Sequence, residues 1–446
     1  MTQGSLTKGI IKFSLPLIAS NLLQVLFNMV DIAVVGRFCG SLALGAVGST
    51  AMLVTLFTGV LTGFSGAVNA IAARCYGAKQ TDVYKMTVRV SAVVMFLVGF
   101  IVLVLGELTT RPVLELLATK EELIDGAELY LRIYFLGMPA IAVFNYASAI
   151  FSAVGNTKTP LYYLGAAGVV NVVLNMVFVL CLGMDVDGVA YASVISHYLS
   201  AALIMTEMFI TKGDCRFRLS ELIPSNLKGG GHILKSIVIL GTSAGAQNAI
   251  FYVANLFVQA GVNTFDAVMV AGNSAAVNSD SIVYNVMNAF YTACGSFVGQ
   301  NYGADKKKRV LKSFLISTGF AFGSGLLLGG LFVISGREFM YLFADETAVI
   351  DAGMTRMVIM GLSYAVSAFM DGTIAASRGL GKSAVPTVMV ILGSCVFRIL
   401  WIKTVFAYFG TIESLYLLYI FSWTITALAE IIYFAAVYRR LGKPSG

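Results

Sequence analysis

Long apolar stretches separated by short polar segments follow one another along the chain, as in Val90–Leu105 and Leu315–Ile334. A helix of about 20 apolar residues, rising about 1.5 Å per residue, crosses the hydrocarbon core of a bilayer. The pattern therefore predicts an all-α polytopic membrane protein with twelve transmembrane helices in two sets of six. The first set covers about 10–36, 46–72, 87–107, 127–152, 160–182 and 188–210, and the second about 234–260, 266–293, 310–334, 350–376, 385–410 and 413–438.

The longest polar segment between these spans, residues 211–232, divides the chain into two predicted lobes, residues 1–210 and 233–446. Three consecutive glycines, Gly229–Gly231, predict a flexible joint within this linker. The N-terminus has no small-residue cleavage site after a short apolar core, so we expect it to enter the first span rather than to be a signal peptide.

Two segments with the same Tyr-Gly-Ala core, Arg74–Asp82 and Gly299–Lys308, follow the second span of each set. At the same offset along the chain, Gly155 matches Gly381. An offset that persists through successive spans indicates two copies of a six-helix unit. Six spans return the chain to its starting side, so we expect a pseudo-two-fold axis along the membrane normal and a cavity opened to either side by rocking. The Tyr-Gly-Ala segments are best explained as tight turns whose basic residues also help to keep these loops on the cytoplasmic side.

The distribution of charge predicts the orientation in the membrane. Only 12% of the residues are charged, and 58% are hydrophobic. Most of the 30 basic residues lie in the loops on the side of the N-terminus, and six are assigned to the opposite side: Arg37, Arg111, Lys120, Arg132, Arg337 and Arg356. By the positive-inside rule, both termini are cytoplasmic in a multi-pass protein of the cell (inner) membrane. The net charge of +7 then reflects topology and lipid contact, not nucleic-acid binding.

Histidine and cysteine provide no catalytic or metal-binding pattern. The six cysteines are scattered without a C-x-x-C pair, and the two histidines, His197 and His232, are far apart in the sequence. We therefore expect no enzyme activity and no cofactor.

Ionisable residues inside predicted spans are costly and are candidates for function. Asp31 has no basic residue in its span, and an unpaired carboxylate in low dielectric either takes a proton or binds a cation such as Na⁺. Asp371 is the corresponding candidate in the tenth span. For Arg398 in the eleventh span, a structural ion pair with Asp371 and a role in the cavity both remain open. Glu430, about two turns before the basic pair that ends the last span, is expected to reach the membrane interface.

Three asparagines extend this pattern. Asn171 and Asn175 are four residues apart and therefore share one helix face, and Asn145 occupies the fourth-span position that Asp371 occupies in the tenth. Amide oxygens can solvate Na⁺ or accept a hydrogen bond from a protonated acid. Hydrogen bonding that only joins helices is the alternative.

Several motifs together resemble the multidrug and toxic compound extrusion (MATE) family of antiporters. They are FSLPLIASNLLQVLFNMVDIAVVGRF in the first span, AARCYGAK and GQNYGAD after the second and eighth spans, and AVGNTKTP and SRGLGKSAVP after the fourth and tenth. The resemblance covers essentially the whole chain. It implies two six-helix lobes around a central cavity, and export of cationic or amphipathic compounds in exchange for H⁺ or Na⁺.

The resemblance also implies roles for single residues. Asp31 matches the acidic coupling residue of the first span, and Asn171 matches an asparagine that joins it. Asn175 stands where many prokaryotic members have a second aspartate, and Ser193 fits a nearby hydroxyl position. Asp371 matches an aspartate of one subfamily.

That subfamily also has a glutamate in the seventh span, where this chain offers only Gln247, Asn248 and Asn255. The coupling ion, with Na⁺ at Asp31 or Asp371 as one alternative to H⁺, therefore stays open.

The sequence thus predicts a monomeric, cation-coupled antiporter for small organic cations or amphipathic drugs. A lipid-linked oligosaccharide flippase of the same superfamily is the main alternative, but several basic residues would be expected in its cavity for the pyrophosphate headgroup. A membrane-embedded enzyme would need clustered catalytic groups, and a channel would not need two rocking lobes.

Overall fold

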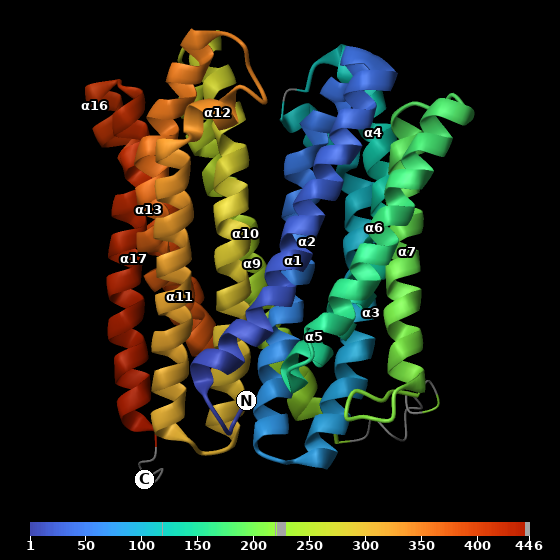
Figure 1. The fold of residues 1–446 in the computed structure, drawn as a ribbon, viewed down its shortest axis with the longest axis vertical. Helices are drawn as coiled ribbons and strands as arrows, with labels where there is room; N and C mark the ends of the chain where they lie inside the picture. The colour runs from blue at the N-terminus through green and yellow to red at the C-terminus, as the bar shows by residue number, and fades with distance from the viewer. Residues whose placement is uncertain (118, 219, 221–228, 442–446) are drawn as a thin grey trace. The chain divides into compact units, whose positions relative to one another are not determined.

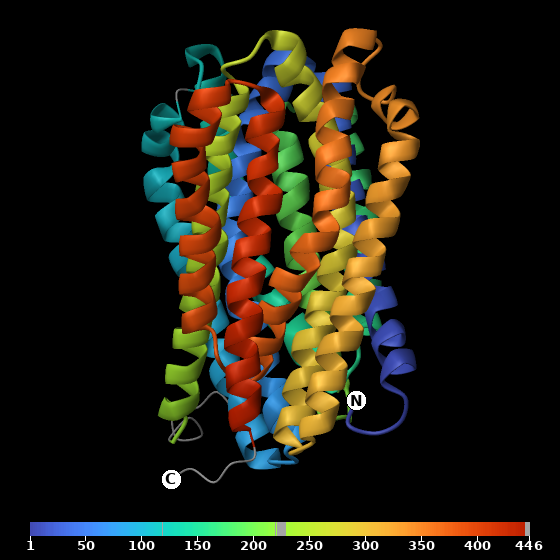
Figure 2. The same cartoon turned by 90° about the vertical axis from the view of Figure 1, so that its left-hand side faces the viewer.

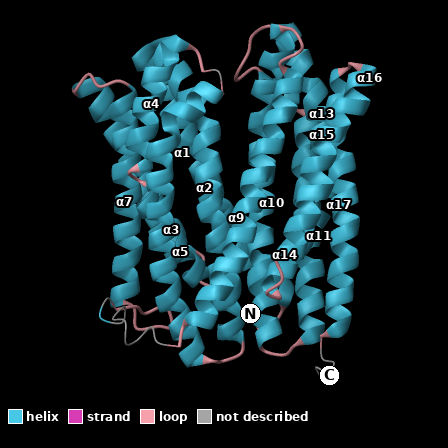
Figure 3. Cartoon of the chain, turned by 180° about the vertical axis from the view of Figure 1, so that it is seen from behind, coloured by secondary structure: helices cyan, strands magenta, loops and turns pink. Residues whose placement is uncertain are grey.

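The computed structural model describes residues 1–117, 119–218, 220 and 229–441, and within these it contains helices and loops but no strand (Figures 1 and 3). Residues 219 and 221–228 of the predicted linker lie outside the described residues.

The helices before the linker are α1 (Leu6–Val34), the π-helical turn η1 (Val35–Cys39), α2 (Gly40–Gly77), α3 (Thr81–Leu116), α4 (Glu121–Phe135), α5 (Met138–Val154), α6 (Lys158–Met176), the π-helical turn η2 (Val177–Cys181) and α7 (Val186–Ile210). Those after it are α9 (Gly231–Val262), α10 (Ala267–Gly303), α11 (Lys307–Ile334), α12 (Gly336–Met340), α13 (Thr347–Gly379), α14 (Ala384–Val390), η4 (Ile391–Val396), α15 (Phe397–Trp401), η5 (Ile402–Phe406), α16 (Ala407–Phe409) and α17 (Ile412–Arg440).

These helices account for the twelve predicted spans. Nine described segments are long and apolar enough to cross a membrane, and α4 with α5, which meet at a 46° bend, can form a tenth. The continuous segment Leu6–Gly77 has 72 residues and contains two of the predicted spans, α1 and α2, which η1 connects. α10 has 37 residues but is not among the nine, and it contains the polar residues Asn273, Asn278 and Asp280.

The two Tyr-Gly-Ala turns have the same local backbone geometry. Lys79 and Asp305, which correspond under the sequence repeat, are the two non-glycine residues with positive φ among the described residues, at 56° and 54°. Gly155 and Gly381, the glycines matched by the repeat, also have positive φ, at 99° and 77°. Because this region of backbone space is unfavourable for most residues, its recurrence at matched positions supports the turn interpretation and the repeat.

Packing divides the chain into two compact units. The N-terminal unit contains residues 19–76 and 80–249, and the C-terminal unit contains residues 1–18, 77–79 and 250–446. The unit boundaries therefore fall inside α1 and α9, whereas the repeat in the sequence places the lobe boundaries between helices.

Contacts of the first half of α1 explain its place in the C-terminal unit. The ring of Phe13 packs edge-on against Phe297 of α10, and Lys306 Nζ donates a hydrogen bond of 2.9 Å to the backbone oxygen of Thr2. At the other boundary, the first half of α9 packs within the N-terminal unit, where a Cβ atom on Gly63 would lie only 2.4 Å from the backbone nitrogen of Gly245. Glycine is needed there because two helix backbones meet.

Within the C-terminal unit, α13 lies beside α10, α11 and α17 (Figures 1 and 2). Within the N-terminal unit, α3 packs against α5, and α6 packs against α7. Large apolar side chains such as Leu108, Leu327 and Ile432 are exposed, as expected of a surface covered by lipid.

Candidate functional site

Four of the predicted site residues meet in the N-terminal unit around Asp31, and we call them the Asp31 cluster: Asp31, Asn171, Asn175 and Ser193. Asp31 is only 8% exposed near the end of α1. Asn175 Nδ2 of α6 donates a hydrogen bond to Asp31 Oδ1, and Ser193 Oγ of α7 donates one of 3.2 Å to Asp31 Oδ2. Each carboxylate oxygen therefore accepts a hydrogen bond from a neutral donor.

Asn171 supports this arrangement from one turn earlier on α6. Its Nδ2 lies 3.5 Å from Ser193 Oγ, and its Oδ1 lies 3.4 Å from Asn175 Nδ2. The four-residue spacing predicted that the two asparagines share a face. The structure shows that Asn175 contacts the carboxylate and that Asn171 acts through its neighbours.

The close approach of α6 to α1 explains how these side chains meet. A Cβ atom on Gly168 would lie 1.8 Å from Cε2 of the Phe27 ring. Glycine at this position leaves room for the Phe27 ring between the two helices, one turn from Asn171 on α6, while Phe27 is itself one turn from Asp31 on α1. A side chain at residue 168 would require the Phe27 ring or one of the helices to shift.

The Asp31 cluster holds one negative charge and spare oxygen atoms. No lysine or arginine of the described residues contributes to the electrostatic environment of Asp31. The buried Oδ1 atom of Asn175 has no hydrogen-bond partner among the described side chains and backbone. Amide and hydroxyl oxygens next to a carboxylate can coordinate Na⁺, and an amide oxygen can accept a hydrogen bond from a protonated acid. The cluster is therefore chemically suited to exchange a monovalent cation.

Asn145, also a predicted site residue, is not part of this cluster. Its backbone oxygen accepts a hydrogen bond of 3.0 Å from Ser65 Oγ, which joins α5 to α2. No hydrogen bond joins its side chain to Asp31 in the part of the chain that the structure describes.

In the C-terminal unit, Asp371 of α13 is partly buried and forms no hydrogen bond or ion pair with any described residue. Arg378 and Arg398 are the basic residues in electrostatic contact with it. The N-terminal and C-terminal candidates therefore have different surroundings, since Asp31 is held by neutral donors and Asp371 faces two arginines.

Arg398 of α15 is fully buried, and its partners are neutral. Its Nη1 donates a hydrogen bond of 2.7 Å to Asn255 Oδ1, and its Nε lies 3.4 Å from Ser422 Oγ. Its guanidinium also lies 4.6 Å from the ring centres of both Phe251 and Tyr419, where cation–π attraction compensates part of its buried charge. No salt bridge joins Arg398 to Asp371 among the described residues; an amide, a hydroxyl and two aromatic faces contact the guanidinium, and Asp371 acts on it only at longer range.

Comparisons with known proteins identify the family. The model of the MatE family matches residues 16–177 and 244–403. The chain belongs to the MatE family. A probable multidrug resistance protein of Bacillus subtilis, YpnP, is 30% identical over 69% of this chain and 68% of its own length.

Two solved structures also have the fold of this MatE protein, each with a TM-score of 0.89. One is an outward-facing multidrug resistance MATE family transporter of the MOP superfamily, with 20% identity, 99% of this chain covered and 97% of its own. The other is a MOP superfamily transporter from Pyrococcus furiosus, described as having a binding pocket of reverse polarity, with 18% identity and 99% and 98% covered. The likeness confirms the predicted all-helical membrane fold.

Sequence analysis did not identify the buried ion pair of this MatE protein, Asp280 of α10 with Arg356 of α13. Nε and Nη2 of Arg356 lie 2.9 and 2.6 Å from Asp280 Oδ2, and both residues are less than 8% exposed. Arg356, which was counted with the basic residues of the outer segments, thus lies inside α13 and is buried rather than exposed in a loop. The signal was present, because both residues fall inside predicted spans, 266–293 and 350–376.

Neutral groups complete the environment of this pair. Arg356 Nη1 and the Tyr416 hydroxyl both donate hydrogen bonds of 2.9 Å to Asn273 Oδ1. Tyr419 lies with its ring centre 5.7 Å from the guanidinium of Arg356, and it also flanks Arg398. With this complete set of partners, the pair is best explained as a structural link between α10, α13 and α17.

Glu430 of α17 does not reach the membrane interface as expected. Its side chain is 0% exposed, and neither carboxylate oxygen has a hydrogen-bond partner among the described residues. The prediction failed because α17 turns this face toward α13 rather than toward lipid.

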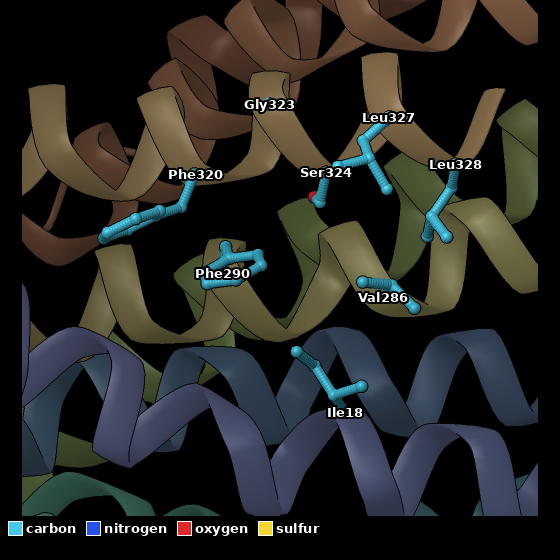
Figure 4. A pocket seen from close by; sticks show the side chains of 8 residues that line it. All are labelled: Ile18, Val286, Phe290, Phe320, Gly323, Ser324, Leu327 and Leu328. Atoms are coloured by element: carbon cyan, nitrogen blue, oxygen red, sulfur yellow. The ribbon is translucent and has the colours of Figure 1, made fainter. Parts of the chain in front are cut away.

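An apolar cavity of about 350 Å³ lies in the C-terminal unit, and none of the residues that line it is ionisable (Figure 4). Ile18 of α1, Phe290 of α10 and Phe320 of α11 line it, and the Ser324 hydroxyl is the one polar side-chain group in its lining. The cavity offers surface for an apolar group but nothing that would recognise charge.

Proposed function

We propose that this MatE protein is a cation-coupled antiporter that exports cationic or amphipathic small molecules in exchange for H⁺ or Na⁺. The observation that supports this most directly is the Asp31 cluster, a buried carboxylate with neutral hydrogen-bond donors and no basic partner among the described residues. Such a group changes its net charge when it binds or releases a cation. That change is what lets a cation gradient bias one conformation over another.

The repeat of six-helix units supports alternating access by rocking of the two lobes. The asymmetry of basic residues supports a cell-membrane orientation with both termini in the cytoplasm. On this proposal the protein works as a monomer.

The charge of the cargo is argued from the same cluster, since the fold alone does not decide it. A relative with this fold is described as having a pocket of reverse polarity. Among the described residues of the N-terminal unit, Asp31 is the one buried charged side chain, which favours a cation. A flippase for a pyrophosphate-linked lipid would instead require a group of basic residues there.

Substitution of Asp31 tests the proposal. Asp31→Asn keeps the size and removes the charge, so we expect normal insertion and binding of the fluorescent cation ethidium, with transport reduced to the background of empty liposomes. The measurement is ethidium movement in proteoliposomes under an imposed pH gradient and, separately, a Na⁺ gradient. The matched control is Asp82→Asn, an exposed aspartate of the same unit. Wild-type transport by Asp31→Asn, or gradient-driven movement of the anion carboxyfluorescein by the wild type, would contradict the proposal.

A further inference from the structure

Glu430 is a buried carboxylate that the proposed mechanism does not yet use. It lies in the middle of the packed face of α17, where Thr426 one turn earlier and Phe434 one turn later are also buried. Neither of its oxygens is in contact with water, and neither accepts a hydrogen bond from a described residue. An ionised carboxylate in that setting is strongly disfavoured, since burial removes its hydration and no donor replaces it.

An apolar cluster closes one side of this position. Phe434 packs with Phe314 of α11 at 4.6 Å between ring centres, and with Ala376 and Leu380 of α13 in one buried cluster. On the other side along α17, Trp423 packs with Tyr364 at 5.4 Å. Glu430 therefore lies between two layers of packed rings.

The charged groups near Glu430 belong to α13. Arg378 and Asp371 are both in electrostatic contact with it, and on its own helix Tyr433 is the titratable neighbour. Asp371 is also faced by Tyr284 and Tyr291 of α10 and, as described above, by Arg398. Arg378 and Asp371 are seven residues apart, about two helical turns, and thus on one face of α13.

The lack of hydrogen-bonding oxygens around the Glu430 carboxyl, among the described residues, indicates which cation it can bind. A sodium ion needs several oxygen ligands at once, which Glu430 lacks among the described residues. A proton needs only one lone pair of the carboxylate. In this respect Glu430 differs from Asp31, whose cluster provides amide and hydroxyl oxygens.

We propose that Glu430 is a proton-binding group of the C-terminal unit, held as the neutral acid in this structure and ionised when Arg378 becomes its partner. On release, the proton passes from the carboxyl oxygen to a water molecule, and the remaining carboxylate is balanced by the guanidinium of Arg378. This rests on and deepens the proposed antiport function by adding a proton-binding group outside the Asp31 cluster.

Infrared spectroscopy of the full-length protein in liposomes tests the protonation state without any transport. At about pH 6, exposed glutamates are ionised, so the carbonyl stretch of a neutral carboxylic acid reports buried acids. We expect Glu430→Gln to remove one such band and Glu413→Gln, an exposed glutamate of the same helix, to keep it. Replacing K⁺ with Na⁺ should leave the band unchanged. A spectrum of Glu430→Gln identical to that of the wild type, or a band abolished by Na⁺, would overturn the proposal.

A second variant protects the test against misfolding. Glu430→Asp keeps an acid at the position, so the band should shift in frequency, and an unshifted band would assign the acid elsewhere and refute the inference. In proteoliposomes, Glu430→Gln should lower the number of protons exchanged for each ethidium transported. An unchanged ratio would show that Glu430 takes no part in coupling. The two proposals can fail separately. Normal transport by Asp31→Asn would contradict the antiport proposal, whereas the proton-binding role of Glu430 is tested by the infrared band alone, which needs no transport.

Discussion

The two units of this protein stabilise buried carboxylates in different ways. In the N-terminal unit, Asp31 is held by the neutral donors of Asn175 and Ser193, and no basic residue of the described chain acts on it. In the C-terminal unit, Asp280 forms an ion pair with Arg356, and Asp371 and Glu430 lie near Arg378. A carboxylate with neutral donors is left uncharged when a cation binds, whereas cation binding to a carboxylate that is already balanced by a basic partner leaves that partner's charge unbalanced.

This contrast predicts that buried aspartates stabilise the fold in the C-terminal unit and bind the coupling ion in the N-terminal unit. A buried ion pair contributes little net stability over an apolar replacement, but removal of one partner leaves an unbalanced charge in the interior. Neutralisation of Asp31 leaves no such charge behind. Substitutions of aspartate by asparagine should therefore affect folding in one unit and transport in the other.

The largest effect on stability is expected from Asp280→Asn. The change leaves the Arg356 guanidinium buried without its counter-ion, which should cost about 3–5 kcal/mol of unfolding free energy. Asp31→Asn should change stability by less than about 1 kcal/mol, because it leaves no charge without a partner. Thermal unfolding of the purified protein in detergent measures both.

The double variant Asp280→Asn, Arg356→Gln is the control for this comparison. It removes both charges together, so most of the lost stability should return. Equal unfolding temperatures for Asp280→Asn and Asp31→Asn would show that the two units do not differ in the way proposed.

How far the sequence predicts these sites depends on what each contact requires. Asp31 was identifiable because it is a lone acid in an apolar span, and the spacing of Asn171 and Asn175 placed them on one face. The direct contact of Asn175 with the carboxylate depends on how closely α6 approaches α1, which Gly168 permits. A sequence pattern fixes a helix face, but the distance between two helices is set by tertiary packing.

Other features needed the three-dimensional contacts. Glu430 was expected at the interface from its distance to the end of its span, but burial against α13 is a property of the partner helix. The division of α1 between the two units also has no signature in the repeat, because the packing of Phe13 on Phe297 joins residues far apart in the chain. The pair of Asp280 and Arg356, in contrast, could have been inferred from two charges of opposite sign in predicted spans.

An intermediate effect is expected from Ser193→Ala. The change removes one of the two hydrogen-bond donors to Asp31, a bond to a charged acceptor worth about 1.5–3 kcal/mol. The cation affinity should therefore change by about tenfold or more. If Ser193 is a Na⁺ ligand, Na⁺ binds more weakly in the variant, and if the coupling ion is a proton, it binds more tightly because the ionised state has lost a donor.

The control for this prediction lies one turn away on the same helix. Ser196 is also buried, but its hydroxyl donates only to the backbone oxygen of Ala192, at 2.8 Å. Ser196→Ala should leave the cation dependence of ethidium transport unchanged. An identical response of the two variants would remove Ser193 from the coupling site.

The smallest effect is expected from Arg111→Ala, which compares an exposed ion-pair group with the buried pair of the other unit. Arg111 of α3 contacts three carboxylates, those of Glu115, Asp125 and Glu128, at 2.8–3.1 Å. Its side chain is nevertheless 43% exposed, so water and salt screen these contacts. Despite three carboxylate partners against one for Arg356, the loss of unfolding free energy should be small, because exposed ion pairs contribute little. It should shrink further in high salt, whereas the effect of Arg356→Ala should persist there, because a buried charge is little screened. Unfolding temperatures at low and high salt measure the difference. If Arg111→Ala lost as much stability as Arg356→Ala, independently of salt, then burial would not be what determines the contribution of these ion pairs.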